Sequence, residues 1–174
     1  MKFFKTTTTI AAAALFFAAG AAQQAAAQEK KPNLKSKHGA WEVHCIEKRC
    51  TMAQTVTNKD GQPIMFLSVL KLPKPKKTDK GDIIAQARII TPLHVSLPHR
   101  LGIRIDDGKI SVAPFVFCNA NGCEAHPVLT SEDLKRFQSG KKLELITVFP
   151  TAQGPKARPV ALSLENFSKA YGDL

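Results

Sequence analysis

Residues 40–56 read AWEVHCIEKRCTMAQTV. In the first part of this stretch the apolar residues Trp41, Val43 and Cys45 alternate with polar ones, which is the pattern of a half-buried strand. A short polar segment follows, and a second strand then returns from Cys50. The stretch therefore predicts two adjacent strands joined by a turn, with one cysteine on each side of that turn.

Further strands are expected along the rest of the chain. They cover residues 64–72, 83–90, 101–105, 109–117, 141–149 and 159–162. The Asp-Gly pair at residues 107–108 is a hairpin signal between two of these strands. Pro73 is expected to end the strand over 64–72 and to begin a loop that stays outside the sheet, because proline lacks the N–H that a ladder needs.

Two segments have helical features instead. Thr130 and Asp133 have the spacing of a capping box, and Gly140 follows as a stop signal. The tail over residues 163–171 carries apolar residues at helical spacing. Many short strands with few helices predict a mainly β fold, which is a single-domain antiparallel β-sandwich or open barrel with one or two short helices.

Four cysteines occur as two pairs with the same C-x4-C spacing. Each pair flanks a turn-like segment, and Asn-Gly in the second pair is a hairpin signal. Of the three pairings that four cysteines allow, the local one is favoured, with disulfides Cys45–Cys50 and Cys118–Cys123. The alternative is a zinc site with all four as ligands, because structural zinc accepts this spacing. An oxidising compartment favours disulfides, so no metal is expected.

The first 27 residues have the three parts of a secretory signal peptide. Lys2 and Lys5 supply a positive start, residues 10–22 are almost wholly apolar, and residues 25–27 are alanines suited to cleavage. The apolar run is shorter than the roughly 20 residues that span a bilayer. The sequence thus predicts a mature protein that begins at Gln28, is periplasmic or secreted, and has no transmembrane segment.

The predicted organisation has three parts. They are a signal peptide over 1–27, a basic and flexible N-terminal segment over 28–39, and one β-rich domain over 40–174. Cleavage after Ala22 is the less favoured alternative. The chain has 25 Lys and Arg against 14 Asp and Glu, so loss of the two signal-peptide lysines leaves a formal charge of +9. This charge favours anionic envelope surfaces as partners, and solubility alone is the competing explanation.

The most unusual segment is residues 71–80, KLPKPKKTDK. Its lysines form a candidate contact with an anionic surface: Lys71, Lys74, Lys76, Lys77 and Lys80. Each lysine close to an anionic leaflet contributes about 1 kcal/mol. The alternative, favoured for charge runs in general, is a solvated loop that guards a sheet edge. No aromatic residues alternate with the lysines, so nucleic acid is not expected as a partner.

The sequence contains no recognisable catalytic motif. His94 and His99 are close in sequence, but no H-E-x-x-H spacing exists. A G-x-S-x-G nucleophile motif and a phosphate-binding glycine loop are also absent. Asp106 and Asp107 are explained by the expected turn. We therefore expect no catalytic residue, no metal and no cofactor.

Several motifs together resemble one protein family. They are Trp41-Glu42-Val43-His44-Cys45 with Cys50 after it, LGIRID at 101–106, Phe117-Cys118 with Gly122-Cys123, and LSLENF at 162–167 with Ala170. With the signal peptide, they resemble the invasion-associated locus B family over essentially the whole mature chain. The resemblance implies an exported, periplasmic or envelope-associated protein, linked in some bacteria to entry into host cells, and it assigns no catalytic residue. The segment 71–80 departs from the family pattern.

Two classes of function remain. The favoured one is a non-catalytic binding module that contributes to host-cell invasion or to envelope function, with an anionic envelope or host surface as the candidate partner. No oligomeric state is predicted. The alternative is an envelope hydrolase whose active site is assembled by the fold without a motif. A cleft with convergent polar groups and perturbed carboxylates would favour the hydrolase, and a basic or apolar patch would favour the module.

Overall fold

The computed structural model describes residues 31–79 and 81–174, and in this part of the chain two antiparallel sheets form the fold. The large sheet contains, in spatial order, β1 (Asn33–His38), β2 (Trp41–Ile46), β3 (Arg49–Thr57), β4 (Pro63–Lys76), β5 (Ile83–Thr91), β9 (Gly122–Ala125) and β8 (Phe115–Asn119), with β10 (Val128–Thr130) also beside β5. The small sheet contains β12 (Lys156–Ser163), β11 (Lys142–Phe149), β6 (Leu101–Ile105) and β7 (Ser111–Ala113).

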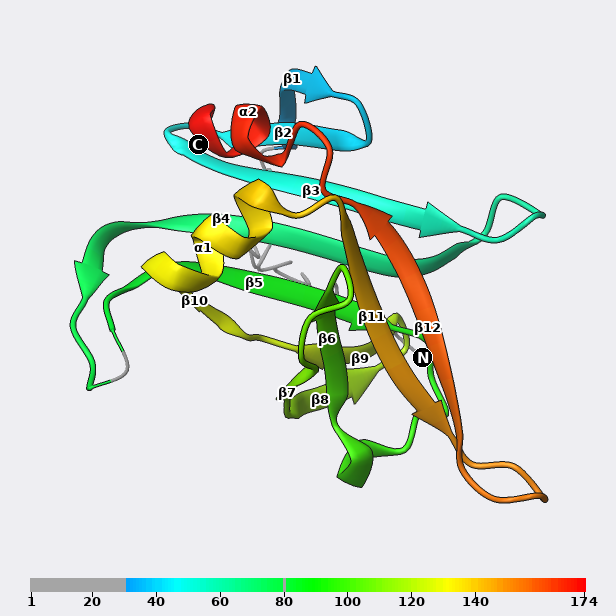
Figure 1. The fold of residues 1–174 in the computed structure, drawn as a ribbon. Helices are drawn as coiled ribbons and strands as arrows, with labels where there is room; N and C mark the ends of the chain where they lie inside the picture. The colour runs from blue at the N-terminus through cyan, green and yellow to red at the C-terminus, as the bar shows by residue number, and fades with distance from the viewer. Residues whose placement is uncertain (1–30, 80) are drawn as a thin grey trace, which may run out of the picture.

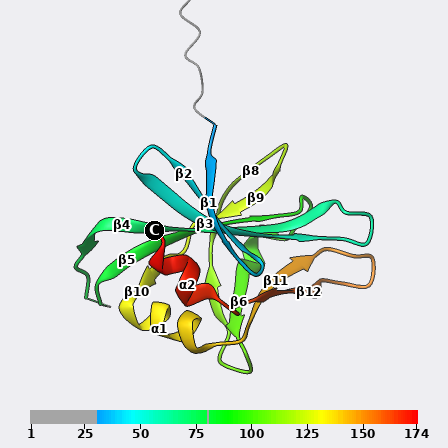
Figure 2. The same cartoon turned by 90° about the horizontal axis from the view of Figure 1, so that it is seen from above.

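The small sheet and two short helices, α1 (Ser131–Ser139) and α2 (Phe167–Gly172), lie on the same side of the large sheet (Figures 1 and 2). A single 3-10 turn at Leu97–His99 precedes β6. The predicted mainly β fold is confirmed, and the two layers give it the form of an antiparallel sandwich. The face of the large sheet that points away from these covering elements is called the outer face below.

The core is built around Trp41, which is fully buried. Its ring meets the ring of Phe167 edge to face, with 5.2 Å between the centroids. Its indole N–H donates to the backbone oxygen of Ser163 over 3.0 Å. The Gln54 amide also bonds the backbone of Ser163, as donor and as acceptor, at 3.1 Å each. Because Ser163 ends β12, these bonds fix the last part of the chain to β2 and β3.

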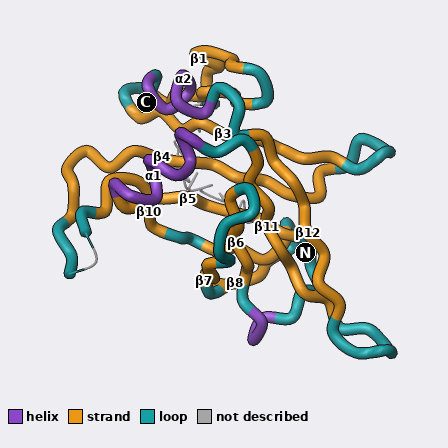
Figure 3. Tube along the Cα trace, in the orientation of Figure 1, coloured by secondary structure: helices purple, strands orange, loops and turns teal. Residues whose placement is uncertain are grey.

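The helix boundaries follow from their caps (Figure 3). The Thr130 hydroxyl accepts from the Asp133 N–H at 3.2 Å, and the Asp133 carboxylate accepts from the Thr130 N–H at 3.0 Å, so the predicted capping box is confirmed. The second helix begins at Phe167, later than the expected 163. Asn166 before it has a φ of 62°, a left-handed conformation that a continuous helix does not contain.

Strand β1 corrects one expectation from the sequence, which was that the segment over 28–39 is flexible. Asn33–His38 instead pair with β2 along an antiparallel ladder. Asp173 at the other end of the chain holds this strand: its carboxylate binds Ser36, and it lies 2.8 Å from Nε2 of His38. The bond with His38, more than the bond with Ser36, lowers the pKa of Asp173 from its usual value. The strand is thus stabilised by contacts that are remote in sequence.

Strand β4 is also longer than predicted. It continues through Pro73 and Pro75 to Lys76, where it pairs with Ile83 of β5 after a shift in register. On its other side β3 pairs with β4 only as far as Leu70. The last residues of β4 therefore form an edge, where a missing proline N–H removes no ladder bond. The expectation that Pro73 ends this strand was wrong for that reason.

The strand expected over 109–117 is two strands in the structure. Ser111–Ala113 pair with β6 in the small sheet, whereas Phe115–Asn119 pair with β9 in the large sheet. Pro114 stands between them. The chain thus passes from one sheet to the other at the proline, which local alternation of side chains does not reveal.

Within residues 31–79 and 81–174, no helix has the length and apolar character needed to cross a membrane. The predicted signal peptide over 1–27 and Lys80 lie outside the described residues.

Candidate functional site

The outer face of the large sheet carries a hollow of about 1080 Å³. Alternation along the strands explains its composition, because every second residue of β2, β3 and β4 points away from the core. It is lined by Pro32, Lys37, Ala40, Glu42, His44, Ile46, Glu47, Arg49, Thr51, Ala53, Thr55, Phe66 and Leu70. The lining combines an apolar floor with charged groups of both signs.

One polar cluster in this hollow is centred on Glu42. Its carboxylate accepts from the Lys37 ammonium at 2.9 Å and lies 3.2 Å from Nε2 of His44. The bond from Lys37, followed by the bond with His44, lowers the pKa of Glu42 from its usual value. The carboxyl group is therefore held in its ionised form, with Lys37 and His44 as its two partners.

A second hollow, of about 190 Å³, adjoins the first, because Thr51 and Leu70 line both. It is lined also by Ser68, Gln86, Ala87, Arg88 and His126. The outer face thus contains two adjoining hollows, which together lie over β2, β3, β4 and β5.

Two residues that line the second hollow, Arg88 and His126, share one buried carboxylate. Glu124 of β9 has an exposed fraction of only 1 %. Arg88 of β5 donates from Nε to Oε2 of Glu124 at 2.7 Å and from Nη2 to Oε1 at 2.6 Å. Nε2 of His126 lies 2.9 Å from Oε2 as well. The Arg88 hydrogen bonds lower the pKa of Glu124 from 4.5 to about 2. Glu124 is therefore held in its ionised form, and it fixes the Arg88 and His126 side chains at the surface.

Sequence reasoning did not find this cluster. Arg88 and Glu124 are 36 residues apart, and each lies in a segment that is otherwise apolar. The one local signal is that Glu124 stands between Cys123 and Ala125, both buried. A charged residue inside a buried strand needs a partner, but only the pairing of β5 with β9 identifies it as Arg88.

The two disulfides are the local ones, Cys45–Cys50 and Cys118–Cys123. In each case the cysteines are direct cross-strand partners beside a turn. Figure 2 shows the turn between β2 and β3 and the β8–β9 hairpin projecting on the same side of the molecule. Each bridge thus closes a hairpin at the border of the outer face. The predicted pairing is the observed one, and no cluster of three metal-ligating side chains occurs among the described residues.

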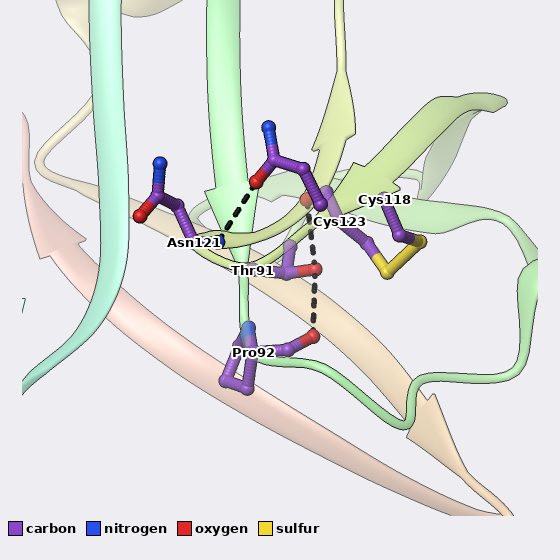
Figure 4. Close-up of a disulfide and its surroundings, with 6 residues drawn as sticks. Thr91, Pro92, Cys118, Asn121 and Cys123 are labelled. Carbon is purple, nitrogen blue, oxygen red and sulfur yellow. Dashed lines mark hydrogen bonds between the residues drawn. A yellow bond between two sulfur atoms is a disulfide. The ribbon is translucent and has the colours of Figure 1, made fainter.

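The surroundings of the Cys118–Cys123 disulfide (Figure 4) explain why a glycine stands directly before Cys123. Gly122 has a φ of 136°, and a Cβ at this position would lie 2.1 Å from the backbone oxygen of Thr91. The Thr91 hydroxyl in turn donates to the backbone oxygen of Cys123 at 3.1 Å. The Asn121 N–H donates to the side chain of Asn119 at 2.8 Å and forms the turn. Only glycine permits the hairpin to lie this close to the end of β5.

The lysines of residues 71–80 differ in their environment. Lys71 lies over the ring of Tyr171, with its Nζ 5.6 Å from the centroid, so it is engaged by α2. Lys74, Lys76 and Lys77 are exposed at the end of β4. Figure 1 shows this end of β4 extending beyond the rest of the molecule. Within the described part of the chain, three of the predicted lysines therefore have no side-chain bond to the protein.

The other histidines singled out from the sequence do not join a site. His99 is bonded to the Ser96 hydroxyl over 2.8 Å within the turn before β6. His94 has a φ of 65° in the loop before that turn. Asp106 accepts from the backbone N–H groups of Lys141 and Lys142, at 3.1 and 2.9 Å, and so joins the end of β6 to the start of β11. These residues therefore belong to the turn, the loop and the strand junction that hold them, and not to a shared site.

Comparison with known proteins gives one family. A family model described as "Invasion associated locus B (IalB) protein" matches residues 41–174. Among solved structures, the invasion-associated protein B from Bartonella henselae is similar, with a TM-score of 0.68 and 20 % sequence identity over 81 % of this chain and 95 % of that chain. At this identity the likeness concerns the fold. No curated protein matches the sequence.

Proposed function

The chain belongs to the invasion-associated locus B family, and from this premise we propose that it is an exported, non-catalytic binding module of the cell envelope that contributes to envelope function or host-cell contact. Its contact with an anionic surface is made by Lys74, Lys76 and Lys77. The observation that carries the proposal is the extension of β4 beyond β3, which presents these three lysines on a projecting sheet edge.

The shape of this edge suits a surface contact. Two prolines and the pairing of Lys76 with Ile83 restrict the backbone, so less conformational entropy is lost on docking than for a free loop. The lysine heads are exposed and keep most of their water in a loose contact. The attraction is screened over about 8 Å at physiological ionic strength, so binding should be salt-sensitive.

The carboxylates support binding over hydrolysis. A hydrolase that uses paired carboxyl groups needs one with a raised pKa to act as general acid. On the outer face the pKa of Glu42 is lowered mainly by its bond from Lys37, and the pKa of Glu124 is lowered mainly by its bonds from Arg88. These groups are therefore suited to hold other side chains in place and are poor proton donors.

The test is the binding of the mature chain to vesicles. Vesicles with an anionic lipid should bind the protein at low salt, and vesicles of a neutral zwitterionic lipid should bind it weakly. Binding to the anionic vesicles should fall as salt is raised. Equal binding to both vesicles, or no binding to either, would contradict the proposed anionic partner.

A further inference from the structure

The second hollow of the outer face is built as a regular grid of side chains. Along one row, Thr51 of β3 is opposite Leu70 of β4, which is opposite Gln86 of β5. In the next row, Ser68 of β4 is opposite Arg88 of β5. Because residues in the same row and on the same face are about 5 Å apart, these side chains converge on one small area.

The fifth polar member of the grid is His126. Ile89 pairs with Ala125 and Gln86 pairs with Val128, so His126 lies beside Arg88 between these two pairs. Arg88 and His126 are 49 % and 29 % exposed at their side chains. Both therefore reach the surface of the hollow, although the carboxylate that binds them is buried.

Much of the hydrogen-bonding capacity of this grid is unused. Within the described residues, the side chains of Thr51, Ser68 and Gln86 have no hydrogen-bond partner. Arg88 uses Nε and Nη2 for Glu124, which leaves Nη1. The hollow thus offers hydroxyl, amide and guanidinium groups around the apolar side chain of Leu70.

The charge of the hollow favours a neutral ligand. The Arg88 charge is already met by Glu124 at 2.6 Å. His126 binds the same carboxylate. An anionic ligand would gain little from the Arg88 guanidinium, because Glu124 already balances its charge. The remaining N–H groups of Arg88 can still donate hydrogen bonds to a neutral ligand. The site therefore suits a ligand with many hydroxyl groups and no charge.

We propose that this hollow binds one ring of a neutral oligosaccharide. A sugar ring presents hydroxyl groups at its edge and an apolar face, which match the polar rim and Leu70. The hollow of about 190 Å³ corresponds to roughly six water molecules at about 30 Å³ each, the amount that a sugar ring with its hydroxyl groups would displace. Buried Glu124 acts as a positioning residue, since it orients Arg88 and His126 before the ligand arrives.

The adjoining larger hollow accommodates the following sugar units. Thr51 and Leu70 belong to both hollows, so a chain can pass from one to the other without leaving the sheet. Further along, Phe66 and Thr55 are cross-strand partners on the same face. An apolar ring beside a hydroxyl group is a suitable surface for a second sugar. A linear oligosaccharide is thus favoured over a single sugar.

The experiment uses nuclear magnetic resonance of the isotope-labelled mature chain with three neutral trisaccharides as probes: maltotriose, cellotriose and chitotriose. At least one should shift the signals of Gln86, Arg88 and His126 at millimolar concentration, with little change between low and high salt. Trigalacturonate, an acidic trisaccharide, should bind more weakly. Absence of shifts with all three neutral probes, shifts confined to another surface, or binding of only the acidic probe would overturn the proposal.

Variants give a second test. Ser68→Ala with Gln86→Ala should weaken binding of the positive probe about tenfold, since two hydrogen bonds to the ligand are lost. Because neither side chain has a partner in the described protein, the fold should persist. Ser139→Ala with Gln153→Ala, both exposed elsewhere, is the matched control and should leave binding unchanged. Equal affinity of the two double variants would contradict the assigned site. The lysine edge is untouched in both, so this outcome is independent of the proposed function.

Discussion

The Arg88 guanidinium and the Glu124 carboxylate form a two-point ion pair, with hydrogen bonds of 2.7 and 2.6 Å, on the outer face of the large sheet. The pair joins β5 to β9 and holds a carboxylate that is almost completely buried. A lone charge in this position would be strongly destabilising, so the two residues act as one structural unit.

The first prediction concerns this pair and pH. The pKa of Glu124 is lowered from 4.5 to about 2 in the folded protein. The ion pair therefore stabilises the fold fully above pH 4.5, and this stabilisation is lost as the pH falls towards about 2. Glu124→Gln should lower the free energy of unfolding by about 1–3 kcal/mol at neutral pH. Urea denaturation should show that this difference from the wild type shrinks between pH 4.5 and 2. The exposed Glu165→Gln is the control, and the same pH dependence in both variants would argue against the assignment.

The second prediction concerns Gly122. Gly122→Ala places a Cβ 2.1 Å from the Thr91 backbone oxygen, so backbone must move. We expect destabilisation of at least about 3 kcal/mol. Gly172→Ala, where a Cβ meets nothing within 4 Å, should change stability little. Thermal unfolding of the two variants checks this, and similar melting temperatures would show that β9 does not lie this close to β5.

The third prediction concerns the cysteines. Each bridge closes a short loop and should contribute about 2 kcal/mol in the chain-entropy model. Peptide mapping without reductant should yield one fragment linked through Cys45 and Cys50 and another through Cys118 and Cys123. A fragment that links Cys45 with Cys118, or bound zinc in stoichiometric amount, would be incompatible with this pairing.

The fourth prediction concerns export. The charged start, the apolar run and the alanines at 25–27 predict cleavage before Gln28. N-terminal sequencing of the protein from the periplasmic or extracellular fraction should begin at this glutamine. A cytoplasmic product that retains Met1 would contradict the prediction.

The strands with regular alternation could be predicted from the sequence. In β2 and β3 the alternation places Trp41 and Met52 in the core, and the cysteines stand beside the turn. The capping box of Thr130 and Asp133 was also recognisable, because a cap depends on neighbours within four residues. Such features are local, and local patterns are what a sequence records directly.

Elements that depend on remote partners could not be predicted. The strand β1 is polar and lysine-containing, and it is held by Asp173 from the far end of the chain. The extension of β4 through two prolines depends on where β3 ends. The outer-face site is of the same kind, since Arg88, Glu124 and Ser68 converge only after the strands have paired.

The central claim is that the lysine edge of β4 makes the contact with an anionic surface. The direct measurement compares vesicle binding of two triple variants that lose the same charge: Lys74, Lys76 and Lys77→Gln, and the control Lys48, Lys59 and Lys109→Gln, all at exposed positions. With about 1 kcal/mol per lysine near the surface, the first variant should bind anionic vesicles at least about tenfold more weakly than the control at low salt. The difference should shrink as salt rises. Equal binding by the two variants at every salt concentration would contradict the claim and leave the edge as a solvated guard of the sheet.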